Sequence, residues 1–161
     1  MYENRKPEPG FFMKKWKELH DSHAGEPGIF SRYACQRIAA RNGRRDASYD
    51  FGTNPCSEII LRPFEFCNLT EVVVRATDGF KDLERKVAIA TILGTIQSTL
   101  TDFKYLRKIW QNNCNEERLL GVSLTGILDN PEIVNDETLS RLRQVAVDVN
   151  REWAEKLGIP A

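Results

Sequence analysis

The stretch Phe51-Gly52-Thr53-Asn54-Pro55-Cys56-Ser57-Glu58-Ile59-Ile60-Leu61 decides how the rest of the chain is interpreted. Its first half is rich in turn-forming residues, and it ends in a short apolar run. This pattern predicts a turn followed by a strand that begins at Ile59. At alternate positions of an extended segment, Asn54, Cys56 and Glu58 would project to one side. They would bring together an amide, a thiol and a carboxylate, which can act as hydrogen-bonding group, reactive sulfur and base.

Two interpretations of this cluster stay open on spacing alone. In one, Cys56 is a buried, small hydrophobic residue at the start of a strand, and Asn54 caps the turn. In the other, the three side chains form a chemical site. A metal site is not predicted, because no two of the four cysteines (Cys35, Cys56, Cys67 and Cys114) form a C-x-x-C pair. His20 and His23 are three residues apart, and we interpret them as surface residues.

Composition restricts the class of protein. The chain has 161 residues, a formal net charge of zero, 41% hydrophobic residues and 29% charged residues. These proportions are typical of one soluble globular domain. No apolar run approaches the ~18 residues that a membrane helix needs, and the charged N-terminus has no signal-peptide pattern. We therefore expect a cytoplasmic protein that binds neither a membrane nor a nucleic-acid polymer.

The remaining chain predicts alternating helices and strands. Amphipathic spacing predicts helices over residues 11–23, 31–43, 82–101 and 136–157, with the apolar face of the second formed by Tyr33, Ala34, Ile38 and Ala39. The third has apolar residues on more than one side, which indicates burial on more than one side. Asp102 is expected to cap a short helix that runs through Trp110. Residues 111–117, which include Cys114, are expected to form a polar loop.

Two further segments have strand patterns. Residues 65–74 predict a second strand, either in a hairpin with residues 59–61 or beside them across a bent connection. Residues 121–128 predict a strand or a strand-to-helix turn. The basic run Arg41, Arg44 and Arg45 is interpreted as a solvated helix end. The alternation of helix and strand favours an α/β fold. The chain has few strands for its helices, so it is interpreted as part of a larger fold.

Four blocks of the sequence, in this order, resemble the catalytic barrel of ribonucleotide reductases: residues 25–30, 51–59, 66–72 and 119–127. Pro55 before the Cys and the form Phe66-Cys67-Asn68-Leu69 are more similar to the adenosylcobalamin-dependent (class II) ribonucleoside-triphosphate reductases than to the diiron class. The resemblance implies a helix-rich part of a ten-stranded α/β barrel over residues 11–161, after an N-terminal tail of residues 1–10. A finger loop around residues 51–61 would lie inside the barrel, shielded from water.

The resemblance also implies a role for each site residue. Cys56 would carry a thiyl radical, Glu58 would act as general base on the 3′ hydroxyl of the ribose, and Asn54 would orient the sugar. Cys67 would be one half of the cysteine pair that supplies the reducing equivalents. The implied cofactor is adenosylcobalamin and the implied substrate is a ribonucleoside triphosphate. A thioredoxin-like protein or a dithiol would be the reductant.

Some family features have no match in the chain. Neither Cys35 nor Cys114 falls on the motif of the partner of Cys67, and the phosphate-binding loop expected after residues 160–161 is not found. We therefore expect a segment that needs the remaining reductase polypeptide and does not turn over alone. Two alternatives are a non-catalytic remnant or assembly piece, and an unrelated thiol enzyme that uses Cys56 with His20 or His23.

Overall fold

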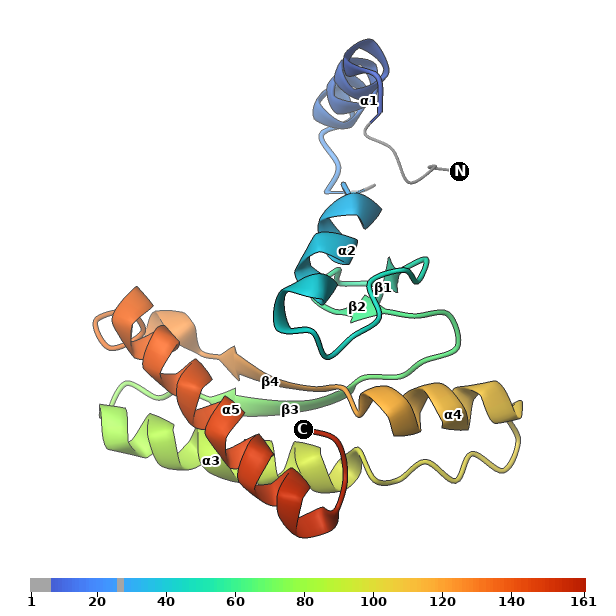
Figure 1. Cartoon of the computed structure of the whole chain (residues 1–161). Coiled ribbons are helices and arrows are strands. Elements are labelled where there is room, and N and C mark those ends of the chain that lie inside the picture. Colours follow the sequence, from blue (N-terminus) through green and yellow to red (C-terminus); the bar gives the residue numbers. More distant parts are fainter. Residues whose placement is uncertain (1–6, 26–27) are drawn as a thin grey trace. The chain divides into compact units, whose positions relative to one another are not determined.

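The computed structural model describes residues 7–25 and 28–161, and Figure 1 shows the order of their helices and strands. The chain divides into two compact units, Met1–Pro63 and Phe64–Ala161, and each is described here by itself. The predicted block at residues 25–30 includes positions 26 and 27, which lie outside the described residues. Most of the predicted N-terminal tail lies outside them as well.

The first unit contains two helices and a small hairpin. Its elements are α1 (Pro9–Ser22), α2 (Arg32–Ala39), the 3-10 helix η1 (Ala40–Asn42), β1 (Gly52–Thr53) and β2 (Ile60–Leu61). The predictions of helices at 11–23 and 31–43 are confirmed. The predicted inner face of α2 is mostly wrong, because Tyr33, Ala34 and Ile38 are exposed and only Ala39 of the four predicted residues is buried. The buried residues are Cys35 and Ala39, which pack with Phe51.

The second unit is a parallel pair of strands with helices packed on it. Its elements are β3 (Asn68–Val73), α3 (Phe80–Gln97), α4 (Lys108–Glu117), β4 (Leu120–Thr125), the 3-10 helix η2 (Ile127–Asp129) and α5 (Asp136–Leu157). β3 and β4 pair in register from Asn68 opposite Leu120 to Val73 opposite Thr125. The core of this unit is formed by aliphatic side chains from β3, α3 and α5, among them Val72, Val74, Leu83, Val87 and Leu142.

Two glycines allow β4 and its exit to pass close to β3. A Cβ atom on Gly121 would lie 2.8 Å from the side chain of Leu69. Gly126 has a φ of 72°, and a Cβ atom there would lie 2.5 Å from the carbonyl oxygen of Val74. A left-handed backbone with no room for a side chain requires glycine. The small-residue pattern of residues 121–128 thus has a packing cause.

The strand predictions are confirmed in part. Strands form near residues 60–61, 68–73 and 120–125, so the α/β class is confirmed. The first two of these do not pair with each other, because β2 pairs with β1 and β3 pairs with β4. Within the described residues the sheets have two strands each and no barrel closes. The ten-stranded barrel therefore stays an expectation that this fold is compatible with.

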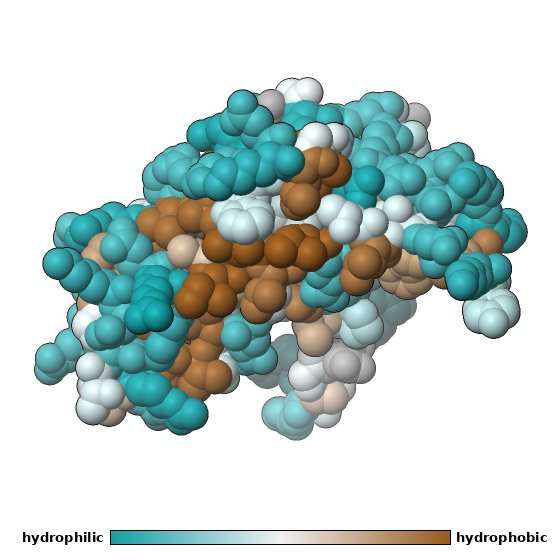
Figure 2. Space-filling view, turned by 90° about the horizontal axis from the view of Figure 1, so that it is seen from below, coloured by the Kyte–Doolittle hydropathy of each residue, from teal (hydrophilic) through white to brown (hydrophobic). Residues whose placement is uncertain are grey.

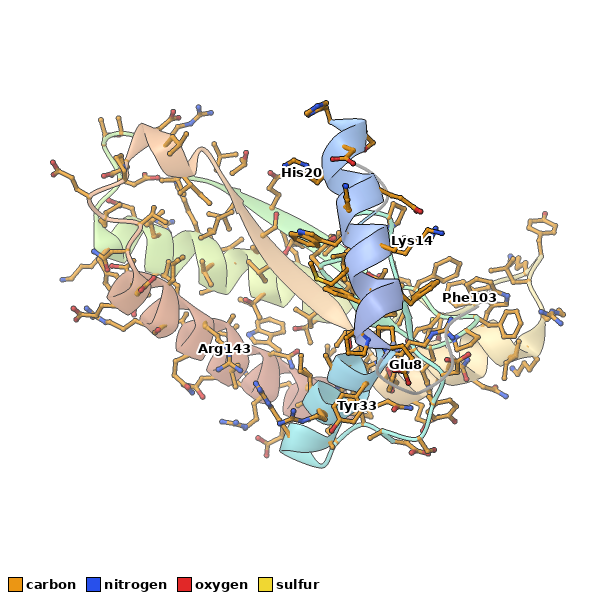
Figure 3. All side chains as sticks on the ribbon, turned by 90° about the horizontal axis from the view of Figure 1, so that it is seen from above. Glu8, Lys14, His20, Tyr33, Phe103 and Arg143 are labelled. Atoms are coloured by element: carbon orange, nitrogen blue, oxygen red, sulfur yellow. The ribbon has the colours of Figure 1, made fainter. Side chains whose placement is uncertain are left out.

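The predicted helix from Asp102 to Trp110 is wrong, and so is the predicted loop around Cys114. The helix begins only at Lys108, and Cys114 is buried inside it. Residues 101–106 instead form tight turns, in which the Phe103 N–H donates to the carbonyl of Thr101. The ring centroids of Phe103 and Phe66 lie 5.3 Å apart. Figure 3 labels Phe103 beside α4. Tertiary packing of the aromatic ring overrides the local helical pattern.

Helix α3 is buried on one side and exposed on another. Thr91 and Thr95 lie on the buried side and satisfy their hydroxyl groups by donating to the carbonyls one turn earlier, at 2.8 Å each. Ile89, Leu93 and Ile96 are exposed. The expectation of burial on more than one side is therefore not met within the described residues. Figure 2 shows a continuous hydrophobic area on the side of the molecule seen from below. Among the described helices, none is long and apolar enough to span a membrane.

Candidate functional site

The predicted site lies on a hairpin loop in the first unit. β1 and β2 are antiparallel, with Gly52 opposite Leu61 and Thr53 opposite Ile60, and residues 54–59 form the loop between them (Figure 1). The Ser57 N–H donates to the carbonyl of Asn54 at 3.0 Å and closes a β-turn. Pro55 occupies the second position of this turn, where its fixed φ is favourable. Cys56 follows at the third position and is therefore at the loop tip.

Asn54 organises this loop through its side chain. Its Oδ1 accepts hydrogen bonds from the backbone N–H of Ile59 at 3.1 Å and from the hydroxyl of Thr53 at 3.3 Å. Its Nδ2 donates to Oε1 of Glu58 at 2.5 Å. The structure therefore brings together Asn54 and Glu58, as the spacing predicted. Within the described residues, Oε2 of Glu58 makes no hydrogen bond, so this oxygen is available to accept a proton.

The path of the backbone differs from the extended segment predicted for residues 54–58. The loop turns, and Ser57 adopts a φ of 67°, which is uncommon for a residue other than glycine. Asn54 and Glu58 therefore meet because the loop folds back, and not because alternate residues of a strand share a face. The strand itself begins one residue later than predicted, at Ile60.

Cys56 is exposed, so the interpretation of it as a buried residue at a strand start is wrong for the described chain. The expected shielding of the loop inside a barrel is likewise not seen within the described residues. The thiol enzyme alternative required a histidine beside Cys56. Within the described residues Cys56 makes no hydrogen bond to His20 or His23, and His20 instead contacts Asp21 through Nδ1 at 3.2 Å. Figure 3 labels His20 on α1.

Arg45 supports the base of the hairpin, a role that the sequence did not indicate. Its Nη1 donates to the carbonyl of Ile60 in β2 at 3.0 Å. Its guanidinium carbon lies 4.9 Å from the ring centroid of Phe51, which is fully buried just before β1. One planar cation thus contacts both ends of the loop. The interpretation of Arg45 as part of a solvated helix end is therefore wrong. The sequence of the basic run alone does not indicate that Arg45, and not Arg41, contacts the hairpin.

Cys67 lies in the second unit, directly before β3, and is half-buried. Its Sγ lies 3.6 Å from the carbonyl oxygen of Asn68, to which the thiol donates. Of the other cysteines, Cys35 and Cys114 are buried. Desolvation by burial raises the pKa of the Cys35 thiol above its usual value, so Cys35 rests as a protonated, unreactive side chain.

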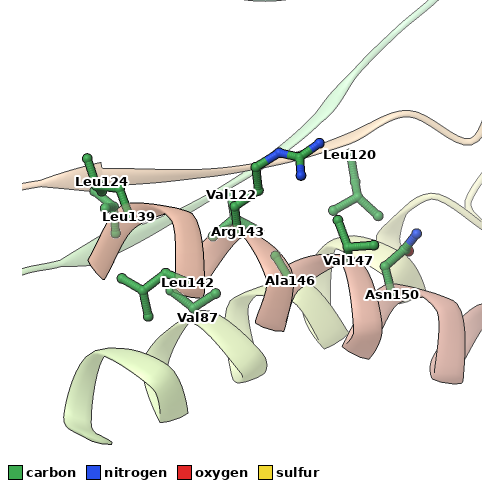
Figure 4. A pocket seen from close by; sticks show the side chains of 10 residues that line it. All are labelled: Val87, Leu120, Val122, Leu124, Leu139, Leu142, Arg143, Ala146, Val147 and Asn150. Atoms are coloured by element: carbon green, nitrogen blue, oxygen red, sulfur yellow. The ribbon is translucent and has the colours of Figure 1, made fainter. Parts of the chain in front are cut away.

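The second unit also contains a cavity of about 370 Å³ between β4, α3 and α5. Figure 4 shows its lining, which is aliphatic except for Arg143 and Asn150. It therefore contains neither a thiol nor a carboxylate, and none of the predicted site residues lines it. Among the described residues there is no group of three or more His, Cys, Asp or Glu side chains placed to hold a metal ion.

Comparison with known proteins finds relatives that all have the same protein name. The chain is 36% identical over 110 residues to the adenosylcobalamin-dependent ribonucleoside-triphosphate reductase of Lacticaseibacillus paracasei, a match that covers 65% of this chain and 14% of the relative. It is 26% identical over 171 aligned positions to the reductase of the same name from Lactobacillus gasseri, covering 84% and 22%. The corresponding Levilactobacillus brevis protein is 37% identical over 114 residues, covering 66% and 14%. No family model matches the chain. No solved structure matches it either.

These similarities confirm the resemblance predicted from the four sequence blocks. The chain is similar to a segment of adenosylcobalamin-dependent ribonucleoside-triphosphate reductases, and it spans between 14% and 22% of the length of these curated relatives.

Proposed function

We propose that this chain contributes the radical loop of a ribonucleoside-triphosphate reductase, an enzyme that reduces ribonucleotides to deoxyribonucleotides for DNA precursor synthesis in the cytoplasm. The observation that carries the proposal is the hairpin loop with Cys56 at its tip and the Asn54–Glu58 hydrogen bond of 2.5 Å at its base. The names of the relatives support the class of reaction.

In the proposed reaction Cys56 acts first, as a thiyl radical. It takes the hydrogen atom from the 3′ carbon of the ribose, so a C–H bond breaks and an S–H bond forms. Thiol S–H and ribose C–H bonds are similar in strength, so the transfer is reversible. An exposed thiol at the tip of a loop can reach a bound sugar, which a thiol buried in a core cannot.

Glu58 is the proposed general base for the 3′ hydroxyl. Loss of this proton assists departure of the 2′ hydroxyl, which takes a proton from the reducing thiol pair and leaves as water. General-base catalysis of this kind contributes about 10²–10⁴-fold. Asn54 holds one oxygen of the Glu58 carboxylate and leaves the other available. Because the Nδ2 group of Asn54 has a second hydrogen, it can also donate to the sugar.

Cys67 is proposed to supply one of the two thiols that reduce the sugar. The pair gives two electrons and becomes a disulfide, which a dithiol or a thioredoxin-like protein then reduces. We place the second thiol of the pair on further reductase polypeptide. Cys35 and Cys114 are both buried, so neither is placed to serve as that thiol.

The proposed cofactor is adenosylcobalamin, by resemblance to the relatives that carry it in their names. When bound, it supplies the radical by homolysis of its cobalt–carbon bond. Cys56 fits as the residue that would face this cofactor, because its thiol is exposed and can give up a hydrogen atom.

A chimeric enzyme tests the proposal. In the Lacticaseibacillus paracasei reductase, the aligned segment is replaced by this chain, and deoxynucleotide formation is measured with a ribonucleoside triphosphate, adenosylcobalamin and a dithiol. We expect turnover in the chimera, none in Cys56→Ser, and a loss of about 10²–10⁴-fold in Glu58→Gln. A folded chimera that makes no deoxynucleotide, or a Cys56→Ser chimera as active as its parent, would refute the assignment.

The same assay on the chain alone tests the need for further polypeptide. We expect no deoxynucleotide without it. Measurable turnover by the isolated chain would contradict this part of the proposal. A chimera that assembles but remains inactive whatever residue occupies position 56 would favour the alternative of a non-catalytic assembly piece.

A further inference from the structure

The segment that leads into Cys67 has an unusual backbone. Phe64 adopts a φ of 62°, in the left-handed region that a bulky side chain rarely occupies. Conformations of this kind persist only where surrounding contacts impose them. Here the carbonyl of Phe64 accepts a hydrogen bond of 3.2 Å from the Nδ2 group of Asn113, a buried residue of α4.

A second side chain of α4 holds the same segment two residues later. The backbone N–H of Phe66 donates to the Sγ atom of Cys114 at 3.4 Å. The Cys114 side chain is buried, with 7% of its surface exposed. The Phe66 ring also stacks on Trp110, with ring centroids 4.5 Å apart and an angle of 27° between the planes. Helix α4 therefore contacts both the backbone and the ring of the residue that precedes Cys67.

The residue after Cys67 is held as well. The backbone N–H and the side-chain Nδ2 of Asn68 both donate to the carbonyl of Leu119, at 3.2 and 3.1 Å. Leu119 follows α4 along the chain. Cys67 is thus bracketed on both sides by contacts to α4 and to the segment that leaves it. The thiol itself donates to the carbonyl of Asn68, the first residue of β3, at 3.6 Å, so its direction depends on the path of the backbone on both sides of Cys67.

We propose that Asn113 and Cys114 are positioning residues for the Cys67 thiol. They hold residues 64–66 in a strained path, and this path fixes where the sulfur of Cys67 points. Cys114 thereby acts as a hydrogen-bond acceptor and not as a redox thiol. The functional meaning of this role rests on the proposed function, in which Cys67 supplies reducing equivalents. The geometry itself can be tested without turnover.

The test compares the alkylation rate of Cys67 in variants of the isolated chain, followed by mass spectrometry of its peptide over a range of pH. The exposed Cys56 in the same sample is the internal reference for the reagent. In Cys114→Ala the Phe66 N–H loses its acceptor, and we expect the Cys67 rate to rise about tenfold. Cys114→Ser keeps an acceptor and should stay within about twofold of the parent chain.

Asn113→Asp provides an independent second variant, because the isosteric carboxylate cannot donate to the carbonyl of Phe64. We expect the same rise in Cys67 reactivity. Asn112→Asp is the matched control, with the same change at an exposed position of the same helix. Amide hydrogen exchange of residues 64–67 should rise in Asn113→Asp and not in Asn112→Asp.

The proposal is overturned if Cys67 reacts at the parent rate, with the parent pH profile, in folded Cys114→Ala and Asn113→Asp. It is also overturned if Cys114→Ser matches Cys114→Ala, since the role would then be packing alone. Should Cys114→Ala fail to fold, the Cys114→Ser and Asn113→Asp results decide. These readouts are separate from deoxynucleotide formation. If the chimera is inactive but the alkylation rate of Cys67 still rises in Cys114→Ala and Asn113→Asp, the proposed function is refuted and the positioning role stands.

Discussion

Asn54→Ala should open the loop that carries Cys56. The substitution removes three side-chain hydrogen bonds: from Ile59 N–H at 3.1 Å, from the Thr53 hydroxyl at 3.3 Å, and to Glu58 at 2.5 Å. A hydrogen bond contributes about 0.5–1.5 kcal/mol net, and we use the lower value because the loop is partly exposed. The sum is about 1.5 kcal/mol. Since ~1.4 kcal/mol is a factor of ten, the open population of the loop should rise about tenfold.

Amide hydrogen exchange of the peptide that spans residues 51–61 measures this population. The Ile59 amide should exchange about tenfold faster in Asn54→Ala, while the peptides of the second unit stay unchanged. Asn112→Ala is the control, because it truncates an exposed asparagine elsewhere. Unchanged exchange at Ile59 would show that the side chain of Asn54 does not hold the loop. The proposed placement of Glu58 would then have no structural support.

A second substitution at the same position separates the acceptor from the donor. Asn54→Asp keeps an oxygen for the Ile59 N–H but faces the carboxylate of Glu58 with a like charge. We expect the loop to be open at neutral pH and to close again when both carboxyl groups are protonated in acid. Equal protection of the Ile59 amide in Asn54→Asp at both pH values, after division by the intrinsic exchange rate at each pH, would argue against direct contact between positions 54 and 58.

Three further predictions concern stability. Arg45→Lys keeps the charge but loses the planar guanidinium that reaches Ile60, so the free energy of opening of the hairpin, measured by amide hydrogen exchange, should fall by about 1 kcal/mol. Unchanged exchange in the hairpin would show that Arg45 does not support it. The hydrogen bond and charge of Lys86 lower the pKa of Asp78. The stability that ionised Asp78 contributes is therefore fully present above the ordinary carboxyl pKa of about 4, and it is lost as the pH falls through the lowered pKa. In denaturant titrations at several pH values, Asp78→Asn should remove this pH dependence. Leu142→Ala, at a core position that is 3% exposed, should cost about 2–5 kcal/mol in the same titrations.

The local pattern of residues 51–61 was enough to predict the loop, and its turn formers did form the turn. It could not predict that Gly52-Thr53 would pair with Ile60-Leu61, because two residues carry no strand periodicity. Contacts from outside the hairpin accompany this antiparallel pairing: the buried ring of Phe51 packs with Cys35 and Ala39, and Arg45 donates to the carbonyl of Ile60. The contact between Asn54 and Glu58 was predicted for a strand and arises from a turn.

The misplaced helix has a similar cause. Residues 102–110 have an acceptable helical pattern, but Phe103 packs on Phe66, and these rings are far apart in the sequence. The helix then forms later, and Cys114 becomes a buried partner of the Phe66 backbone and not a loop residue. Long helices with clear signals were predictable, as for α5, whose extent and C-cap Gly158 agree with the sequence pattern. Its N-cap differs from the expected Asp136, because the Thr138 N–H donates to the side chain of Asn135, one residue earlier.

The parallel pairing of β3 with β4 sets the order in which the second unit can be completed during synthesis. The side chain of Asn68 meets a carbonyl 51 residues further along the chain. Until the ribosome has released that later segment, β3 lacks the strand with which it pairs among the described residues, although α3 can already pack on it. Pairings over such a sequence distance are slow to close. A nascent chain arrested before Leu120 should therefore be sensitive to protease at β3, and this sensitivity should fall once β4 has emerged.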